Sequence, residues 1–184
     1  QLEKPLHWRK PKRIFVADRG DLFHDDVPDD FIDQVFAVMA LCPQHTFMVL
    51  TKQPEGMWDY MRRAESRLHA NLIIHLERPN TPPKWPLPNV YCGVSVWDQD
   101  SANEFIPPLL DTPAAMRFVS AEPLLGPIDF DPIGNALFNR RAAIREAMNS
   151  PAALNWDQAD SSIAYPQLDW VIVGGESGPK ARPM

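Results

Sequence analysis

The chain has 184 residues, of which 45% are hydrophobic and 23% are charged, and its formal net charge is -6 at pH 7. This length suits one domain with its own core, and the composition excludes a disordered or fibrous chain. The acidic balance argues against a nucleic-acid footprint spread over the whole surface, although it permits a local basic edge. No apolar run reaches the roughly 20 residues of a membrane helix, so we expect no membrane segment.

The cysteines point to a reducing compartment. Cys42 and Cys92 are the only two, and they form no CxxC pair. They provide no disulfide framework, so reduced thiols and a cytoplasmic location are the expectation. The chain begins at Gln1 and ends at Met184 within a loop-like stretch, so we expect it to be part of a longer protein.

Short apolar runs that end in polar or charged residues predict five strands. The runs are residues 14–17, 47–50, 90–96, 116–119 and 170–173. A parallel strand is buried on both faces and therefore reads as a continuous hydrophobic segment. We accordingly expect parallel strands that are covered on both sides.

Helical spacing of apolar residues fills the gaps between most of these runs. It predicts one helix from Pro28 to about residue 42 and a second over residues 54–68. A third helix over residues 100–110 should be interrupted at Pro107–Pro108, because proline removes a backbone donor. The proline-rich residues 77–88 predict a stiff connector.

The alternation of strand and helix predicts the α/β fold class. We interpret residues 1–184 as a single domain, a partial (βα) barrel of about five βα units. Residues 131–168 separate the last two strands by a longer stretch, which we interpret as a helical insertion. An open, doubly wound sheet is the alternative. Polar clusters after all five runs favour the barrel, because an open sheet concentrates its site near one switch point.

Two charged residues directly after strands are the candidate catalytic groups. Residues that follow barrel strands line the rim where the chemistry occurs. Lys52 could act as a nucleophile if it is desolvated, and Glu122 could carry a proton. The structural alternatives are salt bridges, from Lys52 to Glu122 or Asp21, or from Glu122 to Arg117.

A glycine-rich turn after the last run is a candidate cofactor site. Gly174 and Gly175 allow a ligand to approach the backbone closely, while Glu176 and Ser177 supply polar groups. The alternative is a tight turn that needs glycine in any case. Thr51 and Ser95, at the ends of other strands, are further candidates for holding a cofactor.

A metal site is not predicted. Asp21 and His24 lie near further acids in residues 20–26, but the spacing fits no known metal-binding template, and capping of the next helix is the better interpretation.

Several strings together resemble a known family. In order they are RIFV (13–16), DLFHDDVP (21–28), VLTK (49–52), GVSV (93–96), RFVSAEPLLG (117–126) and DWVIVGGESG (169–178). This ordered set is similar to the phage-associated, radical S-adenosylmethionine-like family of uncharacterised proteins. The similarity covers nearly the whole chain outside residues 131–168.

The resemblance implies a barrel of the radical-SAM/TIM type and a CxxxCxxC motif whose thiolates hold a [4Fe–4S] cluster. It also implies S-adenosylmethionine as cofactor, a nucleic-acid substrate, since spore photoproduct lyase is among the relatives, and a three-Cys-motif partner protein. These 184 residues contain no such motif. We therefore expect this chain to bind neither the cluster nor another cofactor by itself and to be inactive alone. The cluster and S-adenosylmethionine are expected for a longer protein that carries the motif, which would be an enzyme.

Two other hypotheses remain open from the residues alone. One is a Schiff-base or acid–base barrel enzyme of the aldolase type, with Lys52 as nucleophile and Glu122 as proton carrier. The other is a non-catalytic binding module in which the basic residues Arg140, Arg141 and Arg145 contact a partner or nucleic acid.

Overall fold

The computed structural model describes residues 2–17, 20–64, 84–131, 133 and 167–175. Its elements in chain order are η1 (Lys4–His7), β1 (Arg13–Val16), α1 (Asp29–Leu41), β2 (Thr46–Thr51), β3 (Val90–Val96), α3 (Gln99–Asp111), β4 (Met116–Ala121) and β5 (Trp170–Val173). Residues 54–64, between β2 and β3, are also helical. Each of the five predicted runs is therefore a strand.

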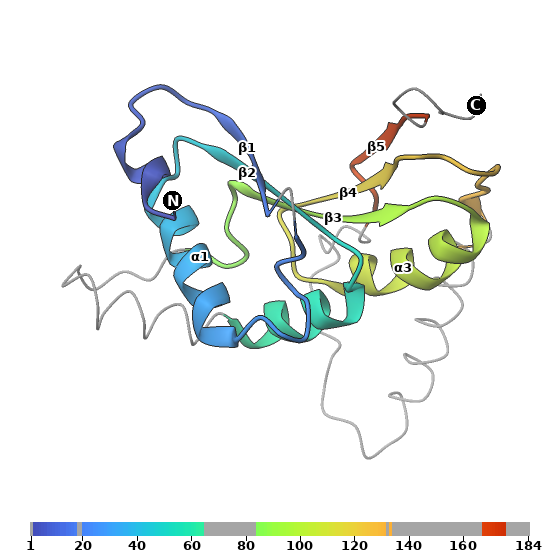
Figure 1. The fold of residues 1–184 in the computed structure, drawn as a ribbon, viewed down its shortest axis with the longest axis horizontal. Coiled ribbons are helices and arrows are strands. Elements are labelled where there is room, and N and C mark those ends of the chain that lie inside the picture. The colour runs from blue at the N-terminus through green and yellow to red at the C-terminus, as the bar shows by residue number, and fades with distance from the viewer. Residues whose placement is uncertain (1, 18–19, 65–83, 132, 134–166, 176–184) are drawn as a thin grey trace, which may run out of the picture.

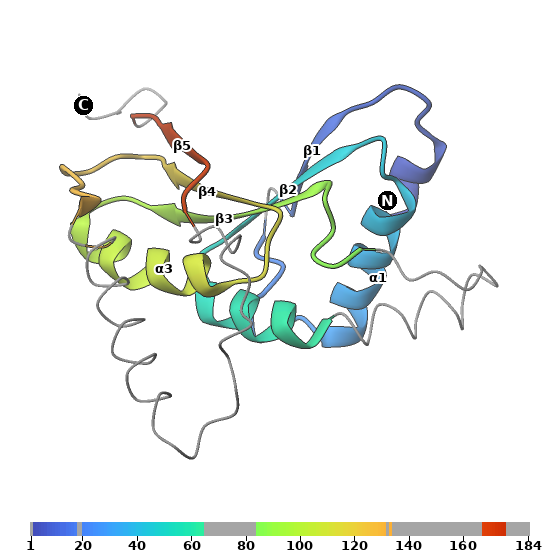
Figure 2. The ribbon, with the colours of Figure 1, turned by 180° about the vertical axis from the view of Figure 1, so that it is seen from behind.

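The strands form one sheet in the order β1-β2-β3-β4-β5, and all four neighbouring pairs are parallel. Parallel strands joined by right-handed crossovers in sequential order place their connecting helices on one face. Figures 1 and 2 show α1, residues 54–64 and α3 on the same side of the sheet. The α/β prediction with five parallel strands is confirmed.

The core lies between the sheet and these helices. Side chains alternate between the two faces of a strand, so the register places Val49, Cys92 and Val119 together on the helix-facing side. All three are fully buried. Phe36 of α1 and Leu109 of α3 are buried against the same core. Complete burial of such an aliphatic or aromatic side chain contributes about 1.5–3 kcal/mol.

The two outer strands depart from the expectation of burial on both faces. Phe15 of β1 is 50% exposed, and Trp170 and Val173 of β5 are 41% and 55% exposed. Within the described sheet each of these strands has a neighbour on one side only, so fewer side chains cover it. Only the three central strands have the burial that the apolar runs suggest.

The expected interruption of the third helix is wrong. α3 runs without a break through Pro107 and Pro108. Ile106 and Leu109 are buried on either side of this pair, so core packing offsets the two missing donors. The hydroxyl of Thr112, the residue that ends the helix, donates to the Pro108 carbonyl at 2.8 Å.

One asparagine joins the amino ends of the central strands. The amide nitrogen of Asn89, just before β3, lies 3.0, 3.1 and 3.2 Å from the carbonyl oxygens of Met39, Cys42 and His45. It thus satisfies carbonyls at the end of α1 and in the turn that leads into β2. His45 is fixed as well, because its Nε2 lies 3.1 Å from the Pro5 carbonyl oxygen.

Some predictions lie outside the described residues. These are the end of the second helix (65–68), much of the proline-rich connector (77–83) and most of the proposed insertion (134–166). Within the described part of the chain, no helix has the length and apolar character to cross a membrane.

Candidate functional site

The face of the sheet away from α1, residues 54–64 and α3 is covered by no helix among the described residues, and we call it the helix-free face. Its residues, assigned from the register, include Arg13, Phe15, Met48, Tyr91, Gly93, Ser95, Phe118, Ser120 and Trp170. Aromatic and aliphatic residues occupy its middle, and the two serines lie side by side toward the carboxyl ends of β3 and β4. Continued alternation along the chain places Lys52, Glu122 and Gly174 beyond them, at the carboxyl edge.

Asp21 fixes the carboxyl end of β2. Its carboxylate accepts hydrogen bonds from the Thr51 hydroxyl at 2.6 Å and from the Lys52 backbone N–H at 2.7 Å. The Phe23 backbone N–H donates to the same carboxylate at 3.0 Å. Thr51 is buried and also accepts from the Gln53 N–H at 2.8 Å. The predicted cofactor residue Thr51 therefore braces the loop after β1 against β2, and its register with Val94 puts it on the helix-facing side.

Glu122 is held against a glycine of the next strand. The Ser120 hydroxyl donates to its carboxylate at 3.1 Å. A Cβ added at Gly174 would overlap the other carboxylate oxygen, so the glutamate side chain occupies the space that glycine leaves free. The Gly174 N–H donates to the Ala121 carbonyl at 3.1 Å, and the Leu124 N–H donates to the Gly174 carbonyl at 2.9 Å. The carboxylate is thus positioned at the edge and remains exposed.

Lys52 lies at the same edge and is exposed. Its ammonium nitrogen lies 5.7 Å from the centroid of the Trp97 ring, within the range of a cation–π contact. Among described residues no ion pair includes Lys52, and Asp21 binds its backbone rather than its ammonium group. At the other end of β4, the Arg117 guanidinium donates to the Thr112 carbonyl, at 2.8 Å from Nη2. Among the described residues, which include all the predicted partners, none of the predicted salt bridges of Lys52 or Glu122 is present.

Asp21 and His24 belong to no metal-ligand cluster within the part of the chain that the structure describes. The described residues contain no group of three His, Cys, Asp or Glu side chains placed to hold a metal ion. His24 is exposed and accepts from the Asp26 N–H at 3.2 Å. The expected capping by these acids also differs from the structure, because Pro28 is the N-cap of α1 and no side chain caps it.

The glycine-rich turn is only partly described. Gly174 follows β5 directly and Gly175 is exposed, whereas Glu176 and Ser177 lie outside the described residues. Of the predicted edge residues, the structure brings Lys52, Ser95, Glu122 and Gly174 to one end of one face. Thr51 lies at the same end but faces the helices.

Sequence reasoning missed three contributors to this face. Trp97 directly follows the third predicted strand and was given no role, yet its carbonyl accepts from the Leu125 N–H at 2.7 Å and its ring lies beside Lys52. The exposed aromatics Phe15 and Trp170 were interpreted as buried strand residues. Their positions on the first and last predicted strands were the available signal, because outer strands lose cover on one side.

The fold and the edge define an α/β protein with a five-stranded parallel sheet, helices on one side and polar groups at the carboxyl ends of its strands. Ligands of parallel α/β proteins bind at this end of the strands. The chain belongs to the family described as "Protein of unknown function (DUF5131)", whose sequence model matches residues 1–184. Searches of curated proteins and of solved structures found no match.

Proposed function

We propose that this chain is the core of a radical S-adenosylmethionine-like partial (βα) barrel that acts on nucleic acid. The single observation that supports this most is the sheet itself, in which five parallel strands follow one another in sequence with α1, residues 54–64 and α3 on one side. This is the order of a βα barrel, whose polar carboxyl edge carries the site. A phage-encoded origin and a three-Cys-motif partner protein are part of the same proposal.

The thiols of this chain do not fit a [4Fe–4S] cluster, which needs a set of cysteine thiolates grouped around it. Cys92 lies within β3 and Cys42 ends α1, and both are fully buried in the core. Burial raises the pKa of the Cys92 thiol to about 12, which disfavours the thiolate that iron requires. Cluster ligands must come from outside these 184 residues, so we assign this chain binding and no radical step.

The carboxyl edge offers groups suited to a nucleoside-type cofactor. Glu122 is an exposed carboxylate held in place by Ser120, and it can accept hydrogen bonds from an amine or a ribose hydroxyl. Gly174 leaves the backbone accessible beside it. Lys52 and Trp97 supply a cation and an aromatic ring at the end of the neighbouring strands.

Titration with S-adenosylmethionine, followed by calorimetry, tests this site. The missing cysteine motif led us to expect no bound cofactor, but the edge residues lie within this chain, so we propose that the wild-type chain binds S-adenosylmethionine. Glu122→Gln should weaken binding about tenfold, the effect of losing one charge-assisted hydrogen bond. Gly174→Val should also weaken binding, because its side chain would displace Glu122. Asn103→Ala, an exposed change on α3, is the matched control and should bind like the wild type.

Two outcomes would contradict the proposal. The first is no binding of S-adenosylmethionine by the wild-type chain, and the second is equal binding by all variants. Anaerobic reconstitution with iron and sulfide is a separate check of the thiol argument, and a stoichiometric cluster on this chain would show that argument to be wrong.

No observation on the described residues supports the aldolase-type enzyme or the non-catalytic binding module. A Schiff-base lysine is normally activated by a desolvated pocket or by a neighbouring cation, whereas Lys52 is exposed. The basic residues Arg140, Arg141 and Arg145 lie outside the described residues.

A further inference from the structure

We propose that the helix-free face binds single-stranded nucleic acid by stacking bases on its aromatic side chains. Basic residues before and at the start of β1 would hold the phosphates. The inference rests on the proposed function for the class of substrate, and it adds the strandedness of that substrate, the surface that takes it and the groups that recognise it.

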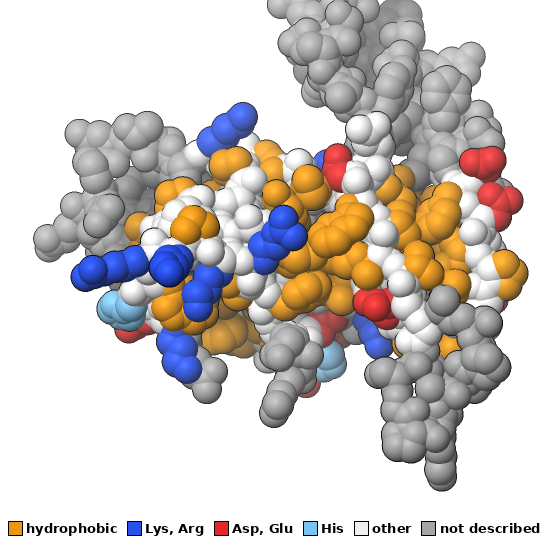
Figure 3. Space-filling model, turned by 90° about the horizontal axis from the view of Figure 1, so that it is seen from above, with side chains coloured by type: hydrophobic (Ala, Val, Ile, Leu, Met, Phe, Trp, Pro, Cys, Tyr) orange, Lys and Arg blue, Asp and Glu red, His pale blue; other side chains and the backbone are white. Residues whose placement is uncertain are grey.

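Several aromatic rings are exposed on the helix-free face. Phe15 is 50% and Trp170 is 41% exposed, and Tyr91 is partly exposed on the same face. The Trp170 ring centroid lies 6.1 Å from that of Phe118, which is fully buried beneath it. Figure 3 shows the resulting broad hydrophobic area on the side of the sheet opposite the helices.

Packing against Phe118 and the spacing of the strands make the exposed rings suitable for stacking. The Phe118 ring lies over the Cα of Gly93, where no side chain could fit, so it is a fixed neighbour of the exposed Trp170 ring. Neighbouring strands lie about 4.8 Å apart, so Phe15 on β1 and Tyr91 on β3 are separated by roughly two strand spacings. Aromatic side chains on an open sheet are a known way to stack two or three unpaired bases.

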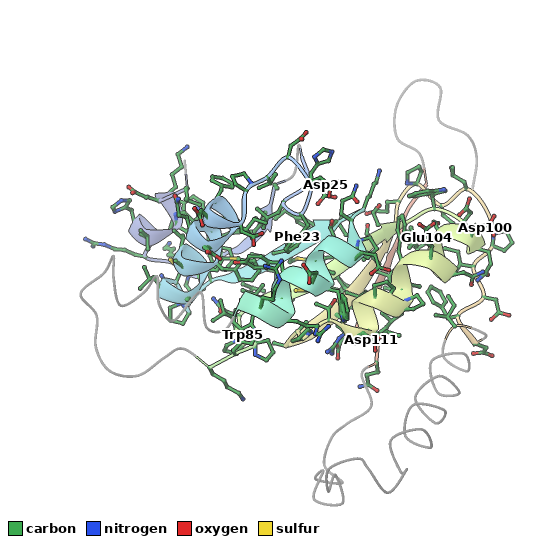
Figure 4. The ribbon with its side chains drawn as sticks, turned by 90° about the horizontal axis from the view of Figure 1, so that it is seen from below. Phe23, Asp25, Trp85, Asp100, Glu104 and Asp111 are labelled. Carbon is green, nitrogen blue, oxygen red and sulfur yellow. The ribbon has the colours of Figure 1, made fainter. Side chains whose placement is uncertain are left out.

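Basic residues before and in β1 are an independent second feature that favours nucleic acid. Residues 2–13 contain five Lys or Arg residues and one acid, and Arg9, Lys10, Lys12 and Arg13 are all exposed. Arg13 shares the helix-free face with Phe15, two residues along β1. The chain is acidic overall, but Figure 4 shows Asp100, Glu104 and Asp111 along α3, on the helical side of the sheet. The basic edge therefore adjoins the aromatic face.

The combination favours a single strand over a duplex. In a duplex the base faces are stacked on one another and cannot reach a protein ring, whereas unpaired bases can be splayed onto it. Base–aromatic stacking contributes to single-strand binding with little sequence preference, while lysines and arginines along the backbone make the affinity depend on salt.

Fluorescence anisotropy with short labelled oligonucleotides tests the inference. The wild-type chain should bind single-stranded DNA or RNA at low salt, and bind a duplex and an abasic strand of equal length less tightly. Phe15→Ala and Trp170→Ala should each weaken binding about tenfold, within the range for loss of one stacked base. Phe31→Ala is the matched control, because Phe31 is 45% exposed on α1, on the helical side.

Two further measurements separate stacking from other causes. Arg13→Gln should reduce the slope of log affinity against log salt by about 0.7, as expected for one lost phosphate contact to a single strand. Phe15→Leu and Trp170→Leu keep apolar area but remove the ring, and they should bind as weakly as the alanine variants. Circular dichroism confirms that each variant is folded.

Several results would overturn the inference: equal affinity for the abasic strand, equal weakening by Phe31→Ala, or no binding by the wild type. Concentration-dependent dimerisation that Phe15→Ala abolishes would assign the face to a second copy of the chain instead. Binding of S-adenosylmethionine without any binding of oligonucleotides would refute this inference and leave the proposed cofactor site standing. The reverse result would refute the cofactor site alone.

Discussion

At the scale of single residues, Gly93 determines how the middle of the helix-free face is packed. A Cβ at this position would lie 2.5–2.6 Å from three carbons of the Phe118 ring, closer than real atoms approach. A glycine within a strand often marks such a close approach. The sequence therefore carried a signal at position 93, but it did not identify Phe118, which lies on the next strand 25 residues away.

Gly93→Ala should lower the free energy of unfolding by about 1–3 kcal/mol, because the Phe118 ring must move out of a packed position. Urea denaturation of the variant and the wild type measures the difference. Gly20→Ala is the control, since no atom lies within 4 Å of its added Cβ. Gly93→Ala should cost much less when Phe118 is also replaced by leucine, and an unchanged cost would contradict the packing explanation.

For the candidate site residues, too, the sequence predicts the position of a side chain but not its partner. The polar positions after the strands could be predicted, because strand ends are visible in the sequence. The partners of these residues could not be predicted. Thr51 binds Asp21, which lies 30 residues away in the chain, and Glu122 contacts Gly174, which follows the neighbouring strand β5. Glu122 lies beside a glycine and a serine, where charge complementarity had suggested a salt bridge to Lys52 or Arg117.

At the scale of elements, α3 begins with a capping box. The Asp98 carboxylate accepts from the Ser101 backbone N–H at 2.9 Å, and the Ser101 hydroxyl accepts from the Asp98 N–H at 3.0 Å. These bonds satisfy donors that the first helical turn leaves free. Both hydrogen bonds from Ser101 to the Asp98 carboxylate lower the pKa of Asp98. The bond from the backbone N–H has the largest effect, and the bond from the hydroxyl is next.

Asp98→Ala should destabilise the protein at neutral pH, and the difference from the wild type should shrink as the solution is acidified. The pKa of Asp98 is lower in the folded state, so its stabilisation is complete above the unfolded pKa of about 3.9 and is lost as pH falls through the folded value. Urea midpoints of both proteins over an acidic pH series measure this. Asn103→Ala removes no titrating group, and its difference from the wild type should not follow the same pH dependence.

The continuity of α3 through Pro107 and Pro108 shows where local rules fail. Proline disfavours a helix interior by about 3 kcal/mol, so sequence reasoning placed a break there. The structure keeps the helix because its buried stripe, with Ile106 and Leu109, packs on the sheet. That packing energy is tertiary, and the local sequence does not contain it.

At the scale of the whole molecule, the reactivity of the two cysteine thiols shows whether the core is folded. Cys42 ends α1 and Cys92 lies in the central strand β3, and both are fully buried. Burial raises the pKa of both thiols, that of Cys92 to about 12. A neutral, inaccessible thiol reacts slowly with alkylating reagents.

We expect neither thiol to be alkylated by iodoacetamide in the folded protein, and both to react once urea unfolds it. Mass spectrometry after timed labelling provides the measurement. The raised folded pKa of Cys92 also means that stability is retained below the unfolded thiol pKa of about 8.5 and declines as pH rises from there toward about 12. Rapid labelling of Cys92 at neutral pH without denaturant would contradict its burial in β3.

The sequence by itself determined the α/β class, the positions of five strands and the polar residues at their carboxyl ends. These features follow from hydrophobic runs and their endings, which are local properties of the chain. Only the tertiary structure decided which face of the sheet is free of described helices, which aromatic rings are exposed on it and which partners Lys52, Thr51 and Glu122 have. Those outcomes depend on strand order and register, which bring together residues that lie tens of positions apart in the chain.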